Sequence, residues 1–343
     1  MDTITHALAG YVAVKSGLNR GTGRWGAIAG VAAAIFPDLD GFFEFFLGTE
    51  FTIKYHRHLT NSLFLAPLFA LIFAWLFVKV SKLPKFRAFF IIWLVEILLH
   101  TFLDVATSFG TMILSPFSDK RFSLDWIFII DPYLTLLLLL SIIALLLWKK
   151  RAETGARVSL AVLTLYISLC AYNHFRALSL ADAFAQEKGL HVEVTAALPQ
   201  PLSPFHWANY VMTDNRIYEG LINLAGNRRE KPGPDAGFIA QILSHYQPVS
   251  DLQYREWVKF EESPWITKAM ELEGVKTFLW FARFPIARYR GIVEGAHTVL
   301  LYDLRFGNIA GRSPFQYVVK FDQEGKLLFA GYVERNIGSP QTE

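Results

Sequence analysis

The sequence predicts an α-helical polytopic membrane domain followed by a mainly β (α+β) extracytoplasmic domain. Of its 343 residues, 53% are hydrophobic and only 18% are charged, which is more apolar than most soluble proteins. The long apolar runs all precede residue 177, whereas beyond Leu180 apolar and polar residues alternate as they do in strands. We therefore expect a membrane-embedded domain over residues 1–176 and a β-rich extracytoplasmic domain over residues 177–343.

Four apolar runs carry the prediction of a membrane domain. They comprise residues 62–78, 88–102, 126–148 and 158–171. Their lengths are close to the roughly 17 to 25 residues with which a helix crosses the hydrocarbon core. Residues 3–16 and 24–36 predict two further helices of only about 20 Å. Such helices end inside the membrane, so polar residues at their ends would line a recessed cavity.

Three alternating stretches predict strands in the second domain. They are residues 275–283, 297–305 and 316–321. The turn residues 322–325 follow the last of these stretches, as expected between two strands.

Basic residues indicate the orientation of the chain in an inner, or plasma, membrane. Lys and Arg cluster at residues 15–24, 79–87 and 149–157, and such loops stay on the cytoplasmic side. The acidic and histidine-bearing loops then face outward, together with the second domain. The whole chain carries 33 Lys and Arg against 30 Asp and Glu. This balance lacks the concentrated basic surface that a nucleic-acid partner requires.

The clearest candidate site is a stripe of three ionisable residues in the second long apolar run. Glu96, His100 and Asp104 are spaced by four, so they share one face of a helix about 6 Å apart. His100 and Asp104 can therefore chelate one ion. Glu96, about 12 Å from Asp104, is expected as a hydrogen-bond partner of a ligand or as a ligand of a neighbouring metal.

Other candidates fall on the same side of the membrane. Cys170 is the one cysteine, so any metal must be held by histidines and carboxylates. These candidates are Asp2, His6, Asp38, Asp40, His56 and His58.

Simpler interpretations stand beside the metal-site hypothesis. Asp131 precedes Pro132, which is typical of a helix N-cap. Arg57 would serve either as a phosphate clamp or as a salt-bridge partner of an acid. The simpler interpretation of His58 is a solvent-facing side chain, and only one of His56 and His58 need be a ligand.

Five ordered motifs resemble the YdjM-like inner-membrane metal-dependent hydrolases. They are residues 1–10 (MDTITHALAG), 37–40 (PDLD), 56–62 (HRHLTNS), 100–104 (HTFLD) and the segment 110–132. The resemblance implies a distant relationship to zinc phospholipase C and P1 nuclease. It also implies metal ligands among His6, Asp38, Asp40, His56, His100 and Asp104. The family commonly has histidine where this chain has Asn61, which is a poor zinc ligand.

The predicted function is hydrolysis of a phosphoester in a lipid or lipid-linked substrate by a metal-activated water. Two or more zinc-like ions would activate the water, Glu96 or Asp40 would accept its proton, and Arg57 would bind the phosphate. The chain lacks the His-Glu-x-x-His and Gly-x-Ser-x-Gly motifs of other hydrolases. Two alternatives remain open. One is a metal-dependent lipid amide or ester hydrolase, and the other is a non-catalytic protein with a structural metal site and a partner-binding outer domain.

Overall fold

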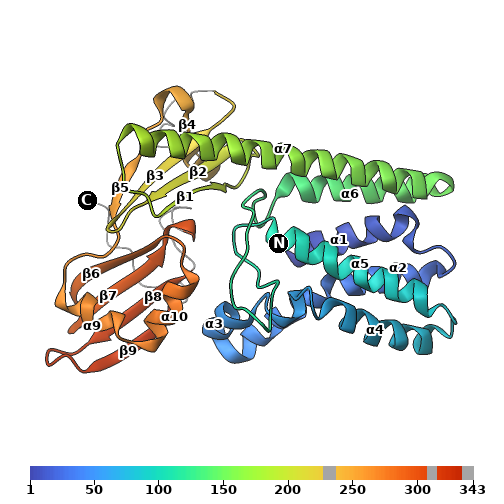
Figure 1. The fold of residues 1–343 in the computed structure, drawn as a ribbon, viewed down its shortest axis with the longest axis horizontal. Coiled ribbons are helices and arrows are strands. Elements are labelled where there is room, and N and C mark those ends of the chain that lie inside the picture. The colour runs from blue at the N-terminus through green and yellow to red at the C-terminus, as the bar shows by residue number, and fades with distance from the viewer. Residues whose placement is uncertain (227–236, 307–314, 334–343) are drawn as a thin grey trace. The chain divides into compact units, whose positions relative to one another are not determined.

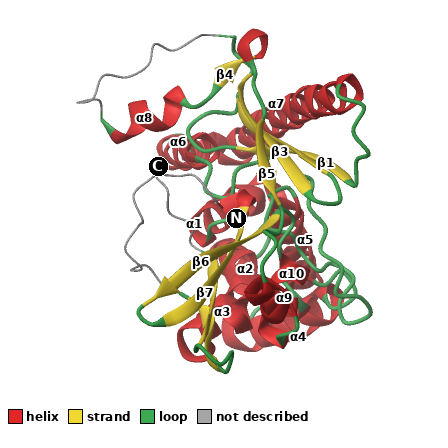
Figure 2. Cartoon of the chain, turned by 90° about the vertical axis from the view of Figure 1, so that its left-hand side faces the viewer, coloured by secondary structure: helices red, strands yellow, loops and turns green. Residues whose placement is uncertain are grey.

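The computed structural model describes residues 1–226, 237–306 and 315–333, which form two compact units (Figure 1). The first unit comprises Met1–Phe175 together with Leu198–His206. The second comprises Arg176–Ala197 and Trp207–Glu343. The first unit is helical, and the second contains the two β-sheets (Figure 2).

Seven α-helices begin within the described part of the first unit. They are α1 (Thr3–Ala13), α2 (Gly23–Ile35), α3 (Glu44–Tyr55), α4 (Ala66–Ser81), α5 (Phe86–Val105), α6 (Pro132–Leu147) and α7 (Ala152–Glu187). Side chains cap two of them. Asp2 accepts a hydrogen bond from the backbone N–H of Thr5 at the start of α1. Asp131 accepts from the N–H groups of Tyr133 and Leu134 at the start of α6, so the predicted N-cap is confirmed.

Among the described residues, two helices are long and apolar enough to cross a membrane. They are Phe86–Val105 and Lys149–Glu187. The segments Gly23–Gly41 and Phe46–Tyr55, bent by 109°, would together make a third. Four long runs led us to expect more spans. However, α4 and α6 have 16 residues each, or about 24 Å. In α6, residues 126–130 precede the N-cap Asp131 instead of extending the helix.

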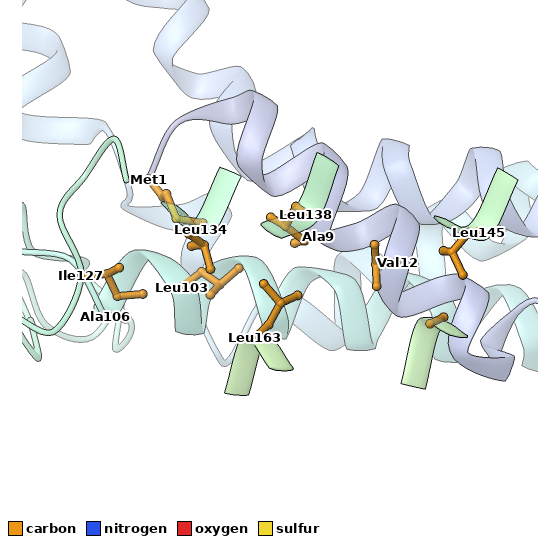
Figure 3. Packing of buried hydrophobic residues seen from close by; sticks show 11 residues of the cluster. Met1, Ala9, Val12, Leu103, Ala106, Ile127, Leu134, Leu138, Leu145 and Leu163 are labelled. Atoms are coloured by element: carbon orange, nitrogen blue, oxygen red, sulfur yellow. The ribbon is translucent and has the colours of Figure 1, made fainter. Parts of the chain in front are cut away.

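Small side chains let the helices of the first unit approach closely. A Cβ atom placed on Gly10 of α1 would lie 2.4 Å from the Cβ of Ala34 on α2, so only glycine fits there. Larger apolar residues fill the remaining space between α1, α5, α6 and α7. Figure 3 shows Val12, Leu103 and Leu138 in this buried cluster. This packing places the N-terminal end of α1 and the C-terminal ends of α2 and α5 together.

The second unit contains two sheets. The first has the order β1 (Val194–Pro199), β2 (His206–Met212), β3 (Arg216–Asn223) and β4 (Gln247–Pro248), with β5 (Arg255–Val258) also paired to β3. The second is antiparallel and joins β6 (Pro285–Val293), β7 (Ala296–Asp303), β8 (Gln316–Phe321) and β9 (Leu327–Tyr332). The helices of this unit are α8 (Phe238–Ser244), α9 (Pro264–Met270) and α10 (Glu273–Phe281).

Two of the three predicted strands are confirmed, and one is wrong. Strands β7 and β8 occupy the predicted stretches, and Gly325, with a φ of 86°, lies in the predicted turn before β9. Residues 275–283, predicted as a strand, instead belong mostly to α10. Their buried residues Val275, Phe278 and Phe281 are spaced by three, which puts them on one face of a helix. That face packs onto the second sheet.

Candidate metal centre

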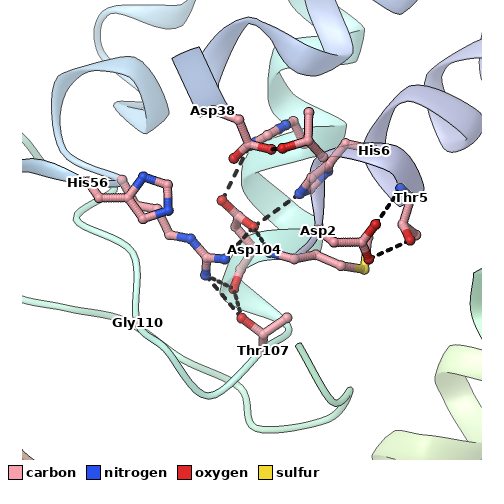
Figure 4. A network of polar contacts seen from close by, with 12 residues as sticks. Asp2, Thr5, His6, Asp38, His56, Asp104, Thr107 and Gly110 are labelled. Carbon is pink, nitrogen blue, oxygen red and sulfur yellow. Dashed lines mark hydrogen bonds and ion pairs between the residues drawn. The ribbon is translucent and has the colours of Figure 1, made fainter. Parts of the chain in front are cut away.

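Four side chains from three separate segments converge in the first unit. His6 lies on α1, Asp38 lies in the 3₁₀ segment Phe36–Phe43 that follows α2, and His100 and Asp104 lie on α5. Each offers one ligand atom, and these atoms all lie within 4.8 Å of one another. His6, His100 and Asp104 are buried, and Asp38 is half-buried. Figure 4 shows His6, Asp38 and Asp104 facing one another. We call these four residues the His/Asp cluster.

Asp104 is at the centre of the His/Asp cluster. Its Oδ1 atom lies 3.1 Å from Nε2 of His6, and its Oδ2 atom lies 3.3 Å from Nε2 of His100. Nε2 of His100 also lies 3.5 Å from Oδ1 of Asp38. The two imidazole rings stack with their centroids 3.6 Å apart. His100 and Asp104 therefore lie on one face of α5 and contact each other, as their spacing predicts. Their role as ligands of one ion stays a prediction.

Neighbouring groups orient the cluster. Nδ1 of His100 lies 2.6 Å from the backbone carbonyl oxygen of Ala34. A hydrogen bond donated from Nδ1 leaves the lone pair on Nε2, which faces the carboxylates. The hydroxyl of Thr3 donates to Oδ2 of Asp38 at 2.7 Å. Metal-binding histidines and carboxylates are commonly supported in this way.

The donor set of the His/Asp cluster fits a divalent transition metal. Nδ1 of His6, Nε2 of His100 and Oδ2 of Asp104 are buried, and among the described residues none makes a hydrogen bond, although the last two atoms lie 3.3 Å apart as an ion pair. Leaving buried polar atoms unpaired is costly, and native proteins rarely do so. A cation held between two imidazoles and two carboxylates would satisfy Nε2 of His100 and Oδ2 of Asp104, and zinc accepts both ligand types.

Arg57 supplies positive charge beside the cluster. Its side chain is buried, and its guanidinium lies 3.0 Å from Oδ1 of Asp104. The same group donates to the hydroxyl of Thr107 at 3.1 Å, and the amino group of Met1 also donates to Asp104. Arg57 therefore makes the salt bridge that was one of its two predicted roles. Its role as a phosphate clamp stays a prediction.

The structure does not bring the predicted ligands Asp40 and His56 into the His/Asp cluster. They face each other instead, with Nδ1 of His56 2.6 Å from Oδ1 of Asp40. The other oxygen of Asp40 accepts hydrogen bonds from the backbone N–H of Arg57 at 3.0 Å and from the hydroxyl of Thr60 at 2.8 Å. Both oxygens of this carboxylate are thus engaged by the segment that follows α3.

Glu96 also lies apart from the cluster. Its side chain is fully buried, and neither carboxylate oxygen makes a hydrogen bond within the part of the chain that the structure describes. One of them lies 3.0 Å from the place where a Cβ on Gly10 would be. No described contact joins Glu96 to the four clustered residues, so its assignment as a proton acceptor stays a prediction.

The remaining candidates have other surroundings. Nε2 of His58 contacts the hydroxyl of Ser115 at 3.0 Å and Oδ1 of Asp119 at 3.4 Å. Asn61 is buried, and its amide makes no hydrogen bond. Asp2 caps α1, and Asp131, besides capping α6, accepts from the hydroxyl of Tyr166 at 2.7 Å.

Two supporting groups were not predicted from the sequence. Thr3 precedes His6 by three residues, so helical spacing places it on the face of α1 that bears the histidine and would have identified it. The carbonyl of Ala34 carries no such signal, because every residue has a backbone acceptor.

Comparisons with known proteins assign the chain to a family. The family model described as YdjM inner membrane protein matches residues 1–177. The chain is also 25% identical over 195 residues to the uncharacterized protein YfhP of Bacillus subtilis (strain 168). That similarity covers 56% of the chain and 57% of YfhP, so the chain spans little more than half of this relative. No solved structure matches significantly. Since the family model covers more than half of its length, the chain belongs to the YdjM inner membrane protein family.

Proposed function

We propose that the protein is a membrane-embedded, metal-dependent hydrolase that cleaves a phosphoester of a lipid or lipid-linked substrate. One observation carries the proposal: the ligand atoms of His6, Asp38, His100 and Asp104 lie within 4.8 Å of one another in a buried setting. Zinc or a similar divalent ion is the proposed cofactor. The His-x-x-x-Asp pair at His100 and Asp104 also motivates the proposed distant relationship to zinc phospholipase C and P1 nuclease.

The residues around the cluster suit reaction at a phosphoester. A bound divalent ion supplies a Lewis acid that polarises a phosphoryl oxygen and makes water more acidic. Arg57 offsets part of the negative charge of Asp104, at 3.0 Å, and so favours approach of an anionic substrate. The contact with Ala34 holds the His100 ring, so the ligand geometry exists before substrate binds.

A lipid substrate follows from the setting of the cluster. The family is one of inner membrane proteins, and α5, which carries two of the four residues, is a candidate membrane span. The basic loops at residues 79–87 and 149–157 support an orientation with the cluster and the second unit outside the cytoplasm.

The test uses purified full-length protein in detergent micelles or lipid nanodiscs. Elemental analysis measures bound metal, and release of phosphorylated head group from phosphatidylcholine and phosphatidylglycerol measures hydrolysis. We expect at least one metal ion per chain, with turnover that a chelator removes and added zinc restores. A protein that binds metal and releases no phosphorylated head group, but releases fatty acid from these lipids or from an N-acylated lipid, would be an amide or ester hydrolase instead.

The second candidate is a non-catalytic protein in which the metal holds the helices together. Burial of three of the four cluster residues favours it, because structural metal sites are closed to substrate. Here a chelator would lower the melting temperature, and none of the lipids tested would turn over. The second unit would then bind a partner.

A further inference from the structure

We propose that His56, held by Asp40, is the proton-transfer group of this hydrolase rather than a metal ligand. The inference rests on the proposed function and adds to it the residue that moves the proton. Nothing in the His/Asp cluster fills this role, because its histidines and carboxylates would be occupied as metal ligands.

Hydrogen bonds fix the orientation of this pair. Nδ1 of His56 lies 2.6 Å from Oδ1 of Asp40, and the other oxygen of Asp40 accepts from the N–H of Arg57 and the hydroxyl of Thr60. A carboxylate held by two further donors can only accept from the imidazole. A neutral His56 facing an ionised Asp40 therefore carries its proton on Nδ1 and its lone pair on Nε2, as in the His–Asp pair of hydrolytic triads.

Nε2 of His56 is available to a reacting water. Within the described part of the chain, it makes no hydrogen bond, and the side chain is 19% exposed. Gly41 lies beside the ring without a side chain, and a Cβ there would be in van der Waals contact with the Cε1 and Nδ1 atoms of His56, at 3.8 Å. His6 and His100, by contrast, are fully buried. A group that exchanges protons with solvent during each turnover needs such access.

Arg57 connects the pair to the metal centre. Its backbone N–H bonds to Asp40 while its guanidinium pairs with Asp104. Its φ of 63° is a conformation that non-glycine residues seldom adopt. In this conformation the backbone N–H of Arg57 faces Asp40 and its guanidinium faces Asp104. His56 is therefore adjacent in sequence to the arginine that contacts a cluster carboxylate.

The proposed step conserves atoms and charge. As the water oxygen forms its bond to phosphorus, Nε2 of His56 accepts a proton from that water. The bond from phosphorus to the leaving alcohol oxygen breaks, and the imidazolium returns the proton to this oxygen. One water is consumed, an alcohol and a phosphomonoester are formed, and His56 regains its starting state.

The decisive variants are His56→Ala and Asp40→Asn, with His58→Ala as the matched control from the same loop. All three should keep wild-type metal content by elemental analysis. Turnover of phosphatidylcholine should fall roughly 10² to 10⁴-fold in His56→Ala, with little change in KM, and should remain near wild type in His58→Ala. Added imidazole should restore part of the turnover of His56→Ala, because this side chain is partly exposed, but none of the turnover of His100→Ala, because that side chain is buried.

Nitrogen-15 NMR of histidine-labelled protein supplies a readout that does not depend on activity. The His56 signals, identified by their loss in His56→Ala, should show a protonated Nδ1 and should not move when metal is removed. Loss of metal in His56→Ala, a proton on Nε2, or wild-type turnover without His56 would each overturn the proton-transfer role alone. A wild-type protein that binds metal but hydrolyses no lipid phosphoester would overturn the proposed function, and this role with it.

Discussion

The imidazole of His100 on α5 is hydrogen-bonded to the backbone carbonyl of Ala34 on α2, with Nδ1 and oxygen 2.6 Å apart. A ligand from one helix is thus oriented by the main chain of another, and the geometry of the His/Asp cluster depends on how closely these helices pack. The first predictions concern the cluster and this packing.

Replacing either residue of the α5 pair should abolish metal binding. In His100→Ala and Asp104→Ala we expect zinc affinity, measured by calorimetric titration, to fall by more than the roughly 10 to 100-fold typical of losing a group that merely orients a ligand. The exposed His191 in the second unit offers a control, His191→Ala, that should bind metal normally. Full occupancy in both α5 variants would show that the pair is joined only by a hydrogen bond.

Replacing Gly10 with a larger residue should disturb the His/Asp cluster indirectly, without changing any of its four side chains. In Gly10→Ala the new methyl group would lie 2.4 Å from the Cβ of Ala34, and overpacking of this kind costs about 1 to 3 kcal/mol of unfolding free energy. The melting temperature and the zinc affinity should fall together. Gly237→Ala, where no described atom lies within 4 Å, should change neither. An unaltered zinc affinity in Gly10→Ala would separate the metal site from the packing of α1 against α2.

Local spacing explains how much of the site could be predicted. His100 and Asp104 share a helix face, so their pairing follows from a separation of four residues. The approach of His6 and Asp38 to His100 is predicted from two short helices, whose outer ends stop inside the membrane at about the depth of His100. The partnership of Asp40 with His56 joins residues 16 apart, and no periodicity reports the loop conformation that brings them together. Residues 275–283 are a similar case. The spacing of their apolar residues is partly compatible with a strand and partly with a helix, and packing against the second sheet favours the helix.

Glu219 in the second unit should make stability depend on pH. Burial raises the pKa of this carboxyl above its ordinary value of 4.5, despite hydrogen bonds from Tyr210 and Trp257. The folded state therefore holds the proton more tightly than the unfolded state. The contribution of Glu219 to stability is most favourable below pH 4.5 and declines as the pH rises through the raised pKa. Chemical unfolding followed by tryptophan fluorescence should show this decline in the wild type.

The variant Glu219→Gln should lose that pH dependence, since its side chain does not titrate. The exposed Glu271 provides the control Glu271→Gln, which should keep the wild-type slope. Equal slopes in wild type and Glu219→Gln would mean that other groups cause the decline.

Topology can be tested by reporter fusions. Because basic loops stay in the cytoplasm, alkaline phosphatase joined after Glu343 should be active in a bacterial host, and the same enzyme inserted after Lys82 should be inactive. Fluorescence of a cytoplasmic reporter should show the opposite pattern. A fluorescent fusion at Glu343 would place the second unit in the cytoplasm and contradict the proposed orientation.

The last prediction concerns Glu96. Its carboxylate is buried, lies against Gly10 and makes no hydrogen bond to any residue that the structure describes. An isolated charge in such a place is strongly disfavoured, so Glu96 is either neutral or close to a cation. If His56 transfers the proton, Glu96→Gln keeps the side-chain shape and should leave both metal content and turnover within about threefold of wild type, well short of the losses that proton-transfer groups cause.

The paired variant Glu96→Ala separates shape from charge. It leaves a cavity beside Gly10 and should lower the melting temperature, as removal of buried side-chain atoms does, whereas Glu96→Gln should leave it unchanged or raise it. A fall in turnover of roughly 10² to 10⁴-fold in Glu96→Gln with metal retained would restore Glu96 as the base. Loss of metal in Glu96→Gln would instead show that the metal site reaches from the His/Asp cluster along α5 to Glu96, and that Glu96 is a ligand.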